Sequence, residues 1–306
     1  MALGYQDKLY FLAFDHRDSF QKKMFGVTGT PTPEQALTID DSKRLVFEGI
    51  LQAVSAGAVP AESGVLVDEQ FGSDIPRRTL AAGLQLAMPV EKSGQAEFDF
   101  QYGEDFPSHI EEFNPAFVKV LVRYNPDDPD TAMNDRQLAR LKTLADWIQA
   151  NDRKFLFELL VPPTEAQLTG VGNDSVRYDQ ELRPELMRRT IATMQDHGIE
   201  VDVWKIEGVD ARADAQMLSE QARSGPGREG VTCVLLGRGA STAKVDEWLQ
   251  QAAPVPGFVG FAIGRSIWWD ALRDFLDKTI DRPTATSLIA NNYLHFVSVY
   301  EAAATA

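Results

Sequence analysis

Cysteine is almost absent from this sequence, which has one, Cys233, among 306 residues. A single thiol cannot form an internal disulfide or supply a cysteine-rich metal site. Because it lies in an apolar run, we expect it to be buried. Long apolar runs are also missing: no stretch approaches the roughly 20 residues of a membrane span, and the initial MALGYQDK lacks the pattern of a signal peptide. We therefore expect a globular, cytoplasmic protein.

Basic residues are few relative to acidic ones, with 30 Lys and Arg against 45 Asp and Glu and a net charge of −15. Binding to nucleic acid or to an anionic membrane needs clustered cations that displace counterions, so we expect neither partner. Only local groups of cations can bind anions in such a chain. If such groups fall together at one place in the fold, they therefore indicate an anion site more strongly than they would in a basic protein.

Apolar runs with strand-like spacing recur along the whole chain and alternate with segments of helical period. The predicted strands are 8–14, 64–70, 84–90, 117–124, 154–161, 201–207, 231–237 and 258–264. The predicted helices are 40–56, 135–150, a helix that ends at Gly198, 241–252, 266–277 and a C-terminal helix 284–303.

Eight strands alternating with helices, without a linker rich in proline or glycine, predict a (β/α)8 barrel that forms a single domain over 1–306. Two regions fit less well: 71–83 is short for a helix, and 91–116 is polar and irregular. A doubly wound α/β sheet is the alternative. The first strand is followed by DHRDSF and not by a glycine-rich dinucleotide loop, which favours the barrel.

Polar residues gather at the carboxyl ends of the predicted strands, where barrels of this kind build their active sites. They are Asp15, His16, Arg17, Asp68, Glu69, Glu91, Lys92, Lys119, Arg123, Glu158, Lys205, Glu207, Gly237, Arg238, Gly239, Gly264 and Arg265.

The period of two along a strand indicates which of these side chains face the barrel interior. Val201, Val203, Lys205 and Glu207 should share one face, and Phe117, Lys119, Leu121 and Arg123 another. If Lys119, Glu158 and Lys205 faced outward, their charges would be buried against the helix layer. We therefore expect all three to face inward.

Two interior lysines and a carboxylate favour amine catalysis. An amine that attacks a ketone must be unprotonated, and desolvation together with a second cation can lower an amine pKa enough. Lys205 as nucleophile with Lys119 beside it fits this requirement. The protonated imine accepts the electrons of a breaking carbon–carbon bond, and Glu158 or Asp15 would move protons. This pattern predicts aldol chemistry without a metal or other cofactor.

The last two strands end in LLGRGAS and AIGRSIWW, and each is followed by a predicted helix start. Glycine lets backbone amides approach an oxyanion, and a helix N-terminus favours negative charge. These two loops form the usual phosphate site of such barrels. The alternative is that the glycines only permit tight turns and that Arg238 and Arg265 pair with acids.

Several stretches resemble the class I tagatose-1,6-bisphosphate aldolase group, which includes the sulfofructose-phosphate aldolases. They are AFDHR at 13–17, FVKVLVRYNPDD at 117–128, the strand with Glu158, VDVWKIEG at 201–208 and AIGRSIW at 262–268. LVDEQFG at 66–72, MPVEKSGQ at 88–95 and DVWKIEG at 202–208 resemble more closely the aldolase-type domain fused to the sugar kinase of bacterial inositol catabolism.

The resemblance implies an imine between Lys205 and a dihydroxyacetone-phosphate moiety, surrounded by Asp15, Lys119 and Glu158. It implies that Gly264 and Arg265 hold the phosphate, and we add Gly237, Arg238, Gly239, Arg17 and His16 as candidate substrate ligands. The implied substrate is 2-deoxy-5-keto-gluconate 6-phosphate. Tagatose-type aldolases carry glutamine where this chain has His16, which disfavours tagatose bisphosphate. We expect a homo-oligomer.

Three functions of other kinds remain open. A metal-dependent aldolase or isomerase would use Asp68, Glu69, Glu158 and Glu207 as ligands, although only His16 among four histidines stands at a strand end. A glycosidase would use Glu69 and Glu158 as acid and base but leaves both interior lysines unexplained. A non-catalytic sugar-phosphate-binding barrel would use Lys205 as an ion-pair partner.

Overall fold

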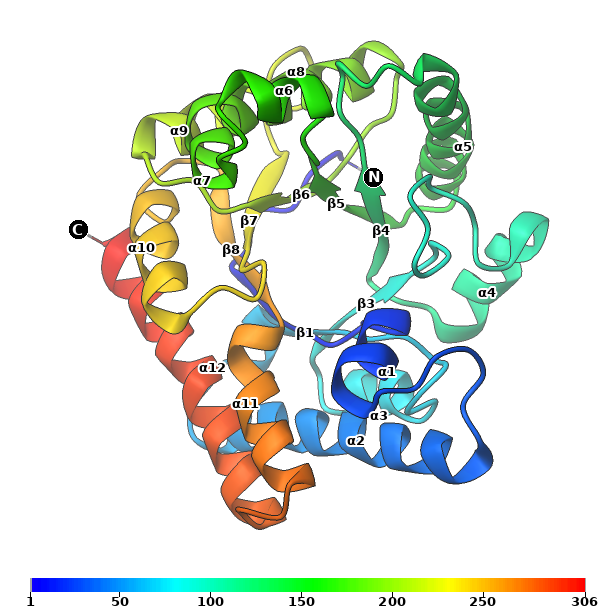
Figure 1. Cartoon of the computed structure of the whole chain (residues 1–306), viewed down its shortest axis with the longest axis vertical. Coiled ribbons are helices and arrows are strands. Elements are labelled where there is room, and N and C mark those ends of the chain that lie inside the picture. The colour runs from blue at the N-terminus through cyan, green and yellow to red at the C-terminus, as the bar shows by residue number, and fades with distance from the viewer. Residues whose placement is uncertain (1, 306) are drawn as a thin grey trace.

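A closed ring of eight parallel strands forms the centre of the molecule in the computed structural model, which describes residues 2–305 (Figure 1). The strands pair in sequence order, and β8 closes on β1. They are β1 (Leu9–Ala13), β2 (Ser63–Leu66), β3 (Gln85–Pro89), β4 (Phe117–Arg123), β5 (Lys154–Leu160), β6 (Val203–Glu207), β7 (Thr232–Leu236) and β8 (Phe258–Ile263). This confirms the predicted (β/α)8 barrel and excludes the doubly wound alternative.

Helices surround the barrel and connect the strands (Figure 1). They are α1 (Asp18–Phe25), α2 (Pro33–Ser55), α3 (Ile75–Ala81), α4 (Phe106–Phe113), α5 (Thr131–Ala150), α6 (Glu165–Gly170), α7 (Ser175–Arg177), α8 (Arg183–Asp196), α9 (Arg212–Ala222), α10 (Thr242–Ala252), α11 (Arg265–Leu276) and α12 (Arg282–Ala304). Short helical turns are η1 (Pro60–Glu62), η2 (Gly103–Asp105) and η3 (Tyr178–Leu182).

Each strand lies where the sequence predicted it, to within a few residues at its ends. The two regions that fitted the barrel pattern less well contain short helices. The segment 71–83 forms α3, and 91–116 forms η2 and α4 after an irregular loop. Both are too short to show a clear helical period in the sequence. The C-terminal helix is α12, which packs beside α2 and α11. Among the described helices, none is long and apolar enough to cross a membrane.

Two apolar clusters separate the inside of the barrel from its outside. The interior cluster contains alternate strand residues, among them Phe117 on β4 and Val203 on β6, whereas the outer cluster joins the other strand faces to the helices. Lys119 and Lys205 each lie two residues beyond these interior positions and so face inward as predicted. Val201 differs: it precedes β6 and packs in the outer cluster, because the alternation begins only where the strand does.

Trp268 and Tyr293 attach the last two helices to the first strand. Trp268 Nε1 donates to the carbonyl of Ala13 at 3.0 Å, and Tyr293 Oη donates to the carbonyl of Tyr10 at 2.8 Å. Both side chains are fully buried. These bonds place the start of α11 next to the end of β1, where the polar residues of the first and last strands come together.

Asp68, at the end of β2, is part of a buried ion pair in the outer layer and not of the barrel mouth. Its carboxylate contacts the ammonium of Lys43 from α2, and it also accepts the backbone N–H groups of Gln70 and Phe71. Lys43 also lies over the rings of Phe20 and Phe71. Burial raises the pKa of Asp68, an effect that Lys43 opposes. The pair ties α2 to β2.

We expect Lys43→Met to lower the free energy of unfolding by about 3 to 5 kcal/mol, because it leaves a buried carboxylate without its cation. Arg44→Met is the matched control on the same helix: its ion pairs with Asp40 and Asp74 are partly exposed, so the loss should stay below about 1 kcal/mol. Urea denaturation at neutral pH measures both. Equal losses in the two variants would contradict a buried, structural role for the Lys43–Asp68 pair.

Candidate active site

Lys205 lies at the carboxyl end of the barrel and lines a cavity of about 570 Å³. Strand register places Leu121, Glu158 and Lys205 side by side on β4, β5 and β6. The Lys205 Nζ atom is 2.9 Å from Glu158 Oε2, and its side chain is almost fully buried. The amine therefore faces a cavity large enough for a small molecule and has a carboxylate as its immediate neighbour.

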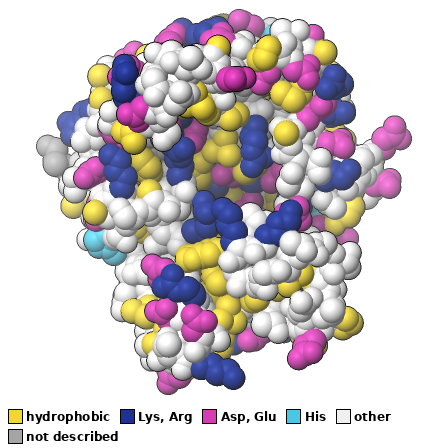
Figure 2. Space-filling model, viewed as in Figure 1, with side chains coloured by type: hydrophobic (Ala, Val, Ile, Leu, Met, Phe, Trp, Pro, Cys, Tyr) yellow, Lys and Arg dark blue, Asp and Glu magenta, His cyan; other side chains and the backbone are white. Residues whose placement is uncertain are grey.

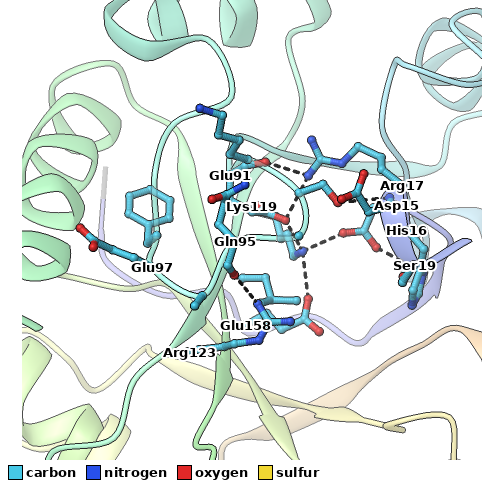
Figure 3. A pocket seen from close by; sticks show the side chains of 17 residues that line it. Asp15, His16, Arg17, Ser19, Glu91, Gln95, Glu97, Lys119, Arg123 and Glu158 are labelled. Atoms are coloured by element: carbon cyan, nitrogen blue, oxygen red, sulfur yellow. Dashed lines mark hydrogen bonds and ion pairs between the residues drawn. The ribbon is translucent and has the colours of Figure 1, made fainter. Parts of the chain in front are cut away.

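Lys119 stands at the centre of a second group of charges, which Figure 3 shows. Its Nζ atom lies 2.7 Å from Asp15 Oδ2, 2.8 Å from Glu91 Oε1 and 3.0 Å from Glu158 Oε2. Glu158 Oε2 is therefore shared by the two lysines. A smaller cavity of about 140 Å³ adjoins this group, and His16, Ser19, Leu121, Arg123 and Glu158 line both cavities.

The charges of this group set the ionisation of its carboxylates. Burial would raise the pKa of Asp15 and of Glu158, but Lys119 and Lys205 outweigh it and hold both pKa values below their usual range. Burial of Glu91 dominates instead, so its pKa is raised despite Lys119 and Arg17. The three carboxylates overcome the burial of Lys119 and raise its pKa. Glu158 is thus a carboxylate at neutral pH and able to accept a proton.

Lys119 lies beside Lys205 as expected, since both ammonium groups contact Glu158 Oε2. Three carboxylates surround Lys119, so its charge is balanced locally. Its geometry is that of a positioning residue: it holds Asp15, Glu91 and Glu158 in fixed places around the mouth of the barrel.

The two residues after Asp15 have different surroundings. His16 lines both cavities and packs edge to face on Trp268, with ring centroids 5.7 Å apart. Burial lowers the pKa of His16 to about 4, against the pull of Asp15, so the ring is neutral at pH 7. Arg17 is buried, donates to the Glu91 carbonyl at 2.8 Å and lines only the smaller cavity. It does not join the loops after β7 and β8.

Those two loops meet on the other side of the larger cavity, which Arg238, Gly239, Gly264 and Arg265 line. Gly264 precedes α11 and provides no side-chain cap, so the first N–H groups of that helix are open to an anion. A Cβ atom on Gly239, whose φ is +71°, would lie 2.8 Å from Arg265 Cζ. Glycine there lets the Arg265 guanidinium lie against the loop, where it donates to the Arg238 carbonyl at 2.9 Å.

Gly237 and Arg238, both predicted substrate ligands, have other contacts in the structure. Gly237 is not among the residues that line the cavity, and a Cβ atom there would meet Ile263 and Val245 of the outer layer. Arg238 lines the cavity but pairs with Asp179 at 2.7 Å and with Glu207 at 2.9 Å. These contacts tie the loop after β7 to η3 and β6.

Lys23, Glu91 and Arg123 line the cavities but were not among the site residues predicted from the sequence. Glu91 and Arg123 stand at predicted strand ends, so their position gave a signal, but nothing in the sequence showed that Glu91 meets Lys119. Lys23 lines the larger cavity from α1, four residues after Ser19, which also lines it. Residues four apart share one face of a helix, so the spacing between Ser19 and Lys23, directly after a strand end with site residues, is the only feature of the sequence that could have indicated Lys23.

A family model described as "Uncharacterized protein conserved in bacteria (DUF2090)" matches residues 3–304. The chain belongs to the DUF2090 family. No curated protein matches it.

Two solved structures resemble this DUF2090 protein over most of its length. Cgl0159 from Corynebacterium glutamicum is 18% identical, with a TM-score of 0.56 over 96% of this chain and 88% of that one. Fructose-bisphosphate aldolase from Plasmodium falciparum, crystallised with TRAP and a small-molecule inhibitor, is 14% identical, with a TM-score of 0.64 over 96% and 91%. At these identities the likeness establishes a shared aldolase-like barrel fold.

Of the acidic residues named in the metal and glycosidase alternatives, only Glu158 and Glu207 line the larger cavity of the DUF2090 barrel. Asp68 pairs with Lys43 in the outer layer, and Glu69 accepts a hydrogen bond from Tyr102 and lines neither of the two cavities at the mouth. Within residues 2–305, no group of three or more His, Cys, Asp and Glu side chains is arranged to hold a metal ion. Glu69 and Glu158 likewise do not face one cavity as an acid and base pair.

We expect Lys119→Met to destabilise the fold more at pH 7 than at pH 4, because it leaves Asp15, Glu91 and Glu158 without their shared cation. In wild-type protein Lys119 holds the pKa values of Asp15 and Glu158 below their usual range. Without this cation, burial favours their neutral forms, so these carboxylates take up protons between pH 7 and pH 4 and the cost of an unpaired buried charge is relieved. At pH 7 the loss should be about 3 to 5 kcal/mol. Urea denaturation at both pH values tests this, and a pH-independent loss would contradict it.

Proposed function

We propose that this protein is a metal-independent, class I aldolase that cleaves a phosphorylated keto sugar, or keto-sugar acid, to dihydroxyacetone phosphate and an aldehyde. The observation that carries the proposal is the position of Lys205. It is an interior lysine whose amine faces a cavity at the carboxyl end of the barrel, 2.9 Å from a carboxylate that is itself held by a second cation. The aldolase-like barrel fold is consistent with this proposal.

The reaction would begin with attack of the unprotonated Lys205 amine on the substrate ketone, and loss of water would give a protonated imine. A base then removes the proton of the hydroxyl group β to the imine carbon. The adjacent carbon–carbon bond breaks, its electrons move to the imine nitrogen as an enamine, and the aldehyde leaves. Protonation of the enamine carbon and hydrolysis release dihydroxyacetone phosphate and the free amine.

Glu158 is suited to the proton transfers because it is ionised and contacts the Lys205 nitrogen directly. It can take protons from the amine and the carbinolamine and return one to the leaving water. Asp15 lines the smaller cavity beside Lys119 and is the second candidate for the proton of the substrate hydroxyl. Lys119 would keep both groups ionised and in place.

The phosphate would bind where Gly239, Gly264 and Arg265 line the larger cavity, at the open N-terminus of α11. Lys23 of α1 lines the same cavity and adds a second cation. Figure 2 shows Lys and Arg side chains around the central hollow of this face, although the chain as a whole carries −15 charges. Such a local positive field attracts an anionic substrate.

The proposed substrate is 2-deoxy-5-keto-gluconate 6-phosphate, which would give malonate semialdehyde as the aldehyde product. This choice rests on the resemblance of residues 66–72, 88–95 and 202–208 to the aldolase-type domain of inositol catabolism. Tagatose bisphosphate and sulfofructose phosphate are the alternatives. We further propose a cytoplasmic homo-oligomer in which each chain, 1–306, forms a single barrel domain.

A non-catalytic barrel that only binds sugar phosphates would use the same anion site but form no imine. Borohydride reduction with dihydroxyacetone phosphate separates the two functions. In an aldolase, Lys205 should gain the mass of dihydroxyacetone phosphate minus one water plus two hydrogens, located by peptide mass spectrometry. Lys205→Met and Lys205→Arg should abolish the adduct and lower turnover at least 1,000-fold, since neither side chain can form an imine.

Lys142→Met is the control for this experiment, because Lys142 lies on the exposed face of α5 and pairs only with Asp146. It should keep both the adduct and the activity. An unmodified Lys205 in wild-type protein, or an adduct that persists in Lys205→Arg, would rule out the proposed imine.

A further inference from the structure

Three of the cations that line the larger cavity lack acidic partners, whereas Lys205 and Arg238 of the same cavity are paired. Among residues 2–305 most Lys and Arg side chains form at least one ion pair, whereas Lys23, Arg123 and Arg265 of this cavity form none within 4.0 Å. A guanidinium placed among carboxylates usually recruits one of them. Three unpaired cations at one cavity indicate that their counter-charge comes from a ligand.

Arg123 is set apart from the other two by the topology of the barrel. It is the last residue of β4, and in a closed ring of eight strands β4 stands opposite β8. Lys23 and Arg265 belong to the helices that follow β1 and β8. A ligand whose phosphate lies at the start of α11 therefore has Arg123 on the far side of the cavity.

Arg123 also lies nearer the mouth of the barrel than the reactive amine of Lys205. Leu121, Glu158 and Lys205 lie side by side at one level of the barrel, and Arg123 pairs in register with Leu160, two residues nearer the mouth. Arg123 therefore stands roughly 7 Å above the level of the reactive amine, at about 3.3 Å per residue. A linear ligand that extends from the proposed phosphate site past Lys205 would therefore have its other end at Arg123.

The acids near Arg123 are already engaged. Glu158 contacts the two lysines, and Glu97 of the smaller cavity pairs with Arg136 and Arg140. The one hydrogen bond of the Arg123 guanidinium runs from Nη1 to the carbonyl of Gln95 at 3.0 Å, as Figure 3 shows. This bond orients the group over the boundary between the two cavities and leaves its charge unneutralised.

We propose that Arg123 is a specificity-determining residue that binds a second anionic group, a carboxylate or a phosphate, at the end of the substrate distant from the first phosphate. This inference rests on the proposed function and deepens it: the substrate would be a linear sugar derivative with an anion at each end, and the aldehyde released would itself be charged. An Arg–carboxylate or Arg–phosphate pair can be bidentate, which gives both affinity and orientation.

Binding of unreactive linear ligands tests this without relying on catalysis. Glucitol 6-phosphate carries one anionic end, whereas glucitol 1,6-bisphosphate and 6-phosphogluconate carry two. Calorimetric titration of wild-type protein should show at least tenfold tighter binding of one or both two-anion ligands. The ligand that gains more identifies the second group as a phosphate or a carboxylate.

Arg123→Gln should remove this advantage, with a loss of about tenfold or more for the two-anion ligand, and should leave the affinity for glucitol 6-phosphate within about twofold. Arg123→Lys should restore part of it. Arg153→Gln is the matched control: Arg153 also has no acidic partner within 4.0 Å, but it lines a separate cavity with Lys154 and Asp202, at the opposite end of the barrel. It should bind all three ligands as wild type does.

Equal affinity of wild-type protein for the three ligands, or an equal loss for all three in Arg123→Gln, would overturn the inference. A failure of this inference about Arg123 can be distinguished from a failure of the proposed aldolase function. Borohydride trapping of wild-type protein with dihydroxyacetone phosphate, which has a single anionic end, depends on Lys205 and tests the aldolase alone.

Discussion

The mouth of this barrel depends on one buried ammonium group, that of Lys119. Asp15, Glu91 and Glu158 come from the ends of three other strands, and all three carboxylates lie within 3.0 Å of the same nitrogen. Removing four charged groups from water is costly unless each finds its partner with good geometry. The requirement therefore fixes the side chains at the ends of β1, β3, β4 and β5 relative to one another, and through Glu158 it also fixes the neighbour of Lys205.

The closed ring of strands forms a cavity that is open at the mouth of the barrel and closed below the level of these charges. Below the charged level the interior is filled by apolar side chains such as Phe11, Phe117 and Val203, so a ligand cannot pass deeper. At and above this level the cavity is lined by the proposed anion site at β8 and α11, the amine on β6 and a guanidinium on β4 without an acidic partner. Because opposite strands of a ring face each other, the proposed substrate, a linear molecule with an anion at each end, would lie across the mouth.

The fold was largely predictable from the sequence because every strand carries an apolar run and most connecting helices show a clear period. The exceptions have physical reasons. The helices α1, α3 and α4 are too short for periodicity to identify them, and Val201 lies before β6 begins. The helix α9 was also missed, and α2 begins at residue 33, seven residues before the predicted start at 40. Asp68 stood at a strand end like the site residues, yet Lys43 of α2 draws it into the outer layer.

The sequence by itself determined the barrel and the inward direction of Lys119, Glu158 and Lys205, because alternation along a strand is a local property of the backbone. Only the tertiary structure decided that Glu91 completes the shell of Lys119, that Arg17 faces the smaller cavity, and that Lys23 and Arg123 are left without acidic partners. Such contacts join residues far apart in the chain. They depend on strand register and on ring closure, which arise from the packing of the whole molecule.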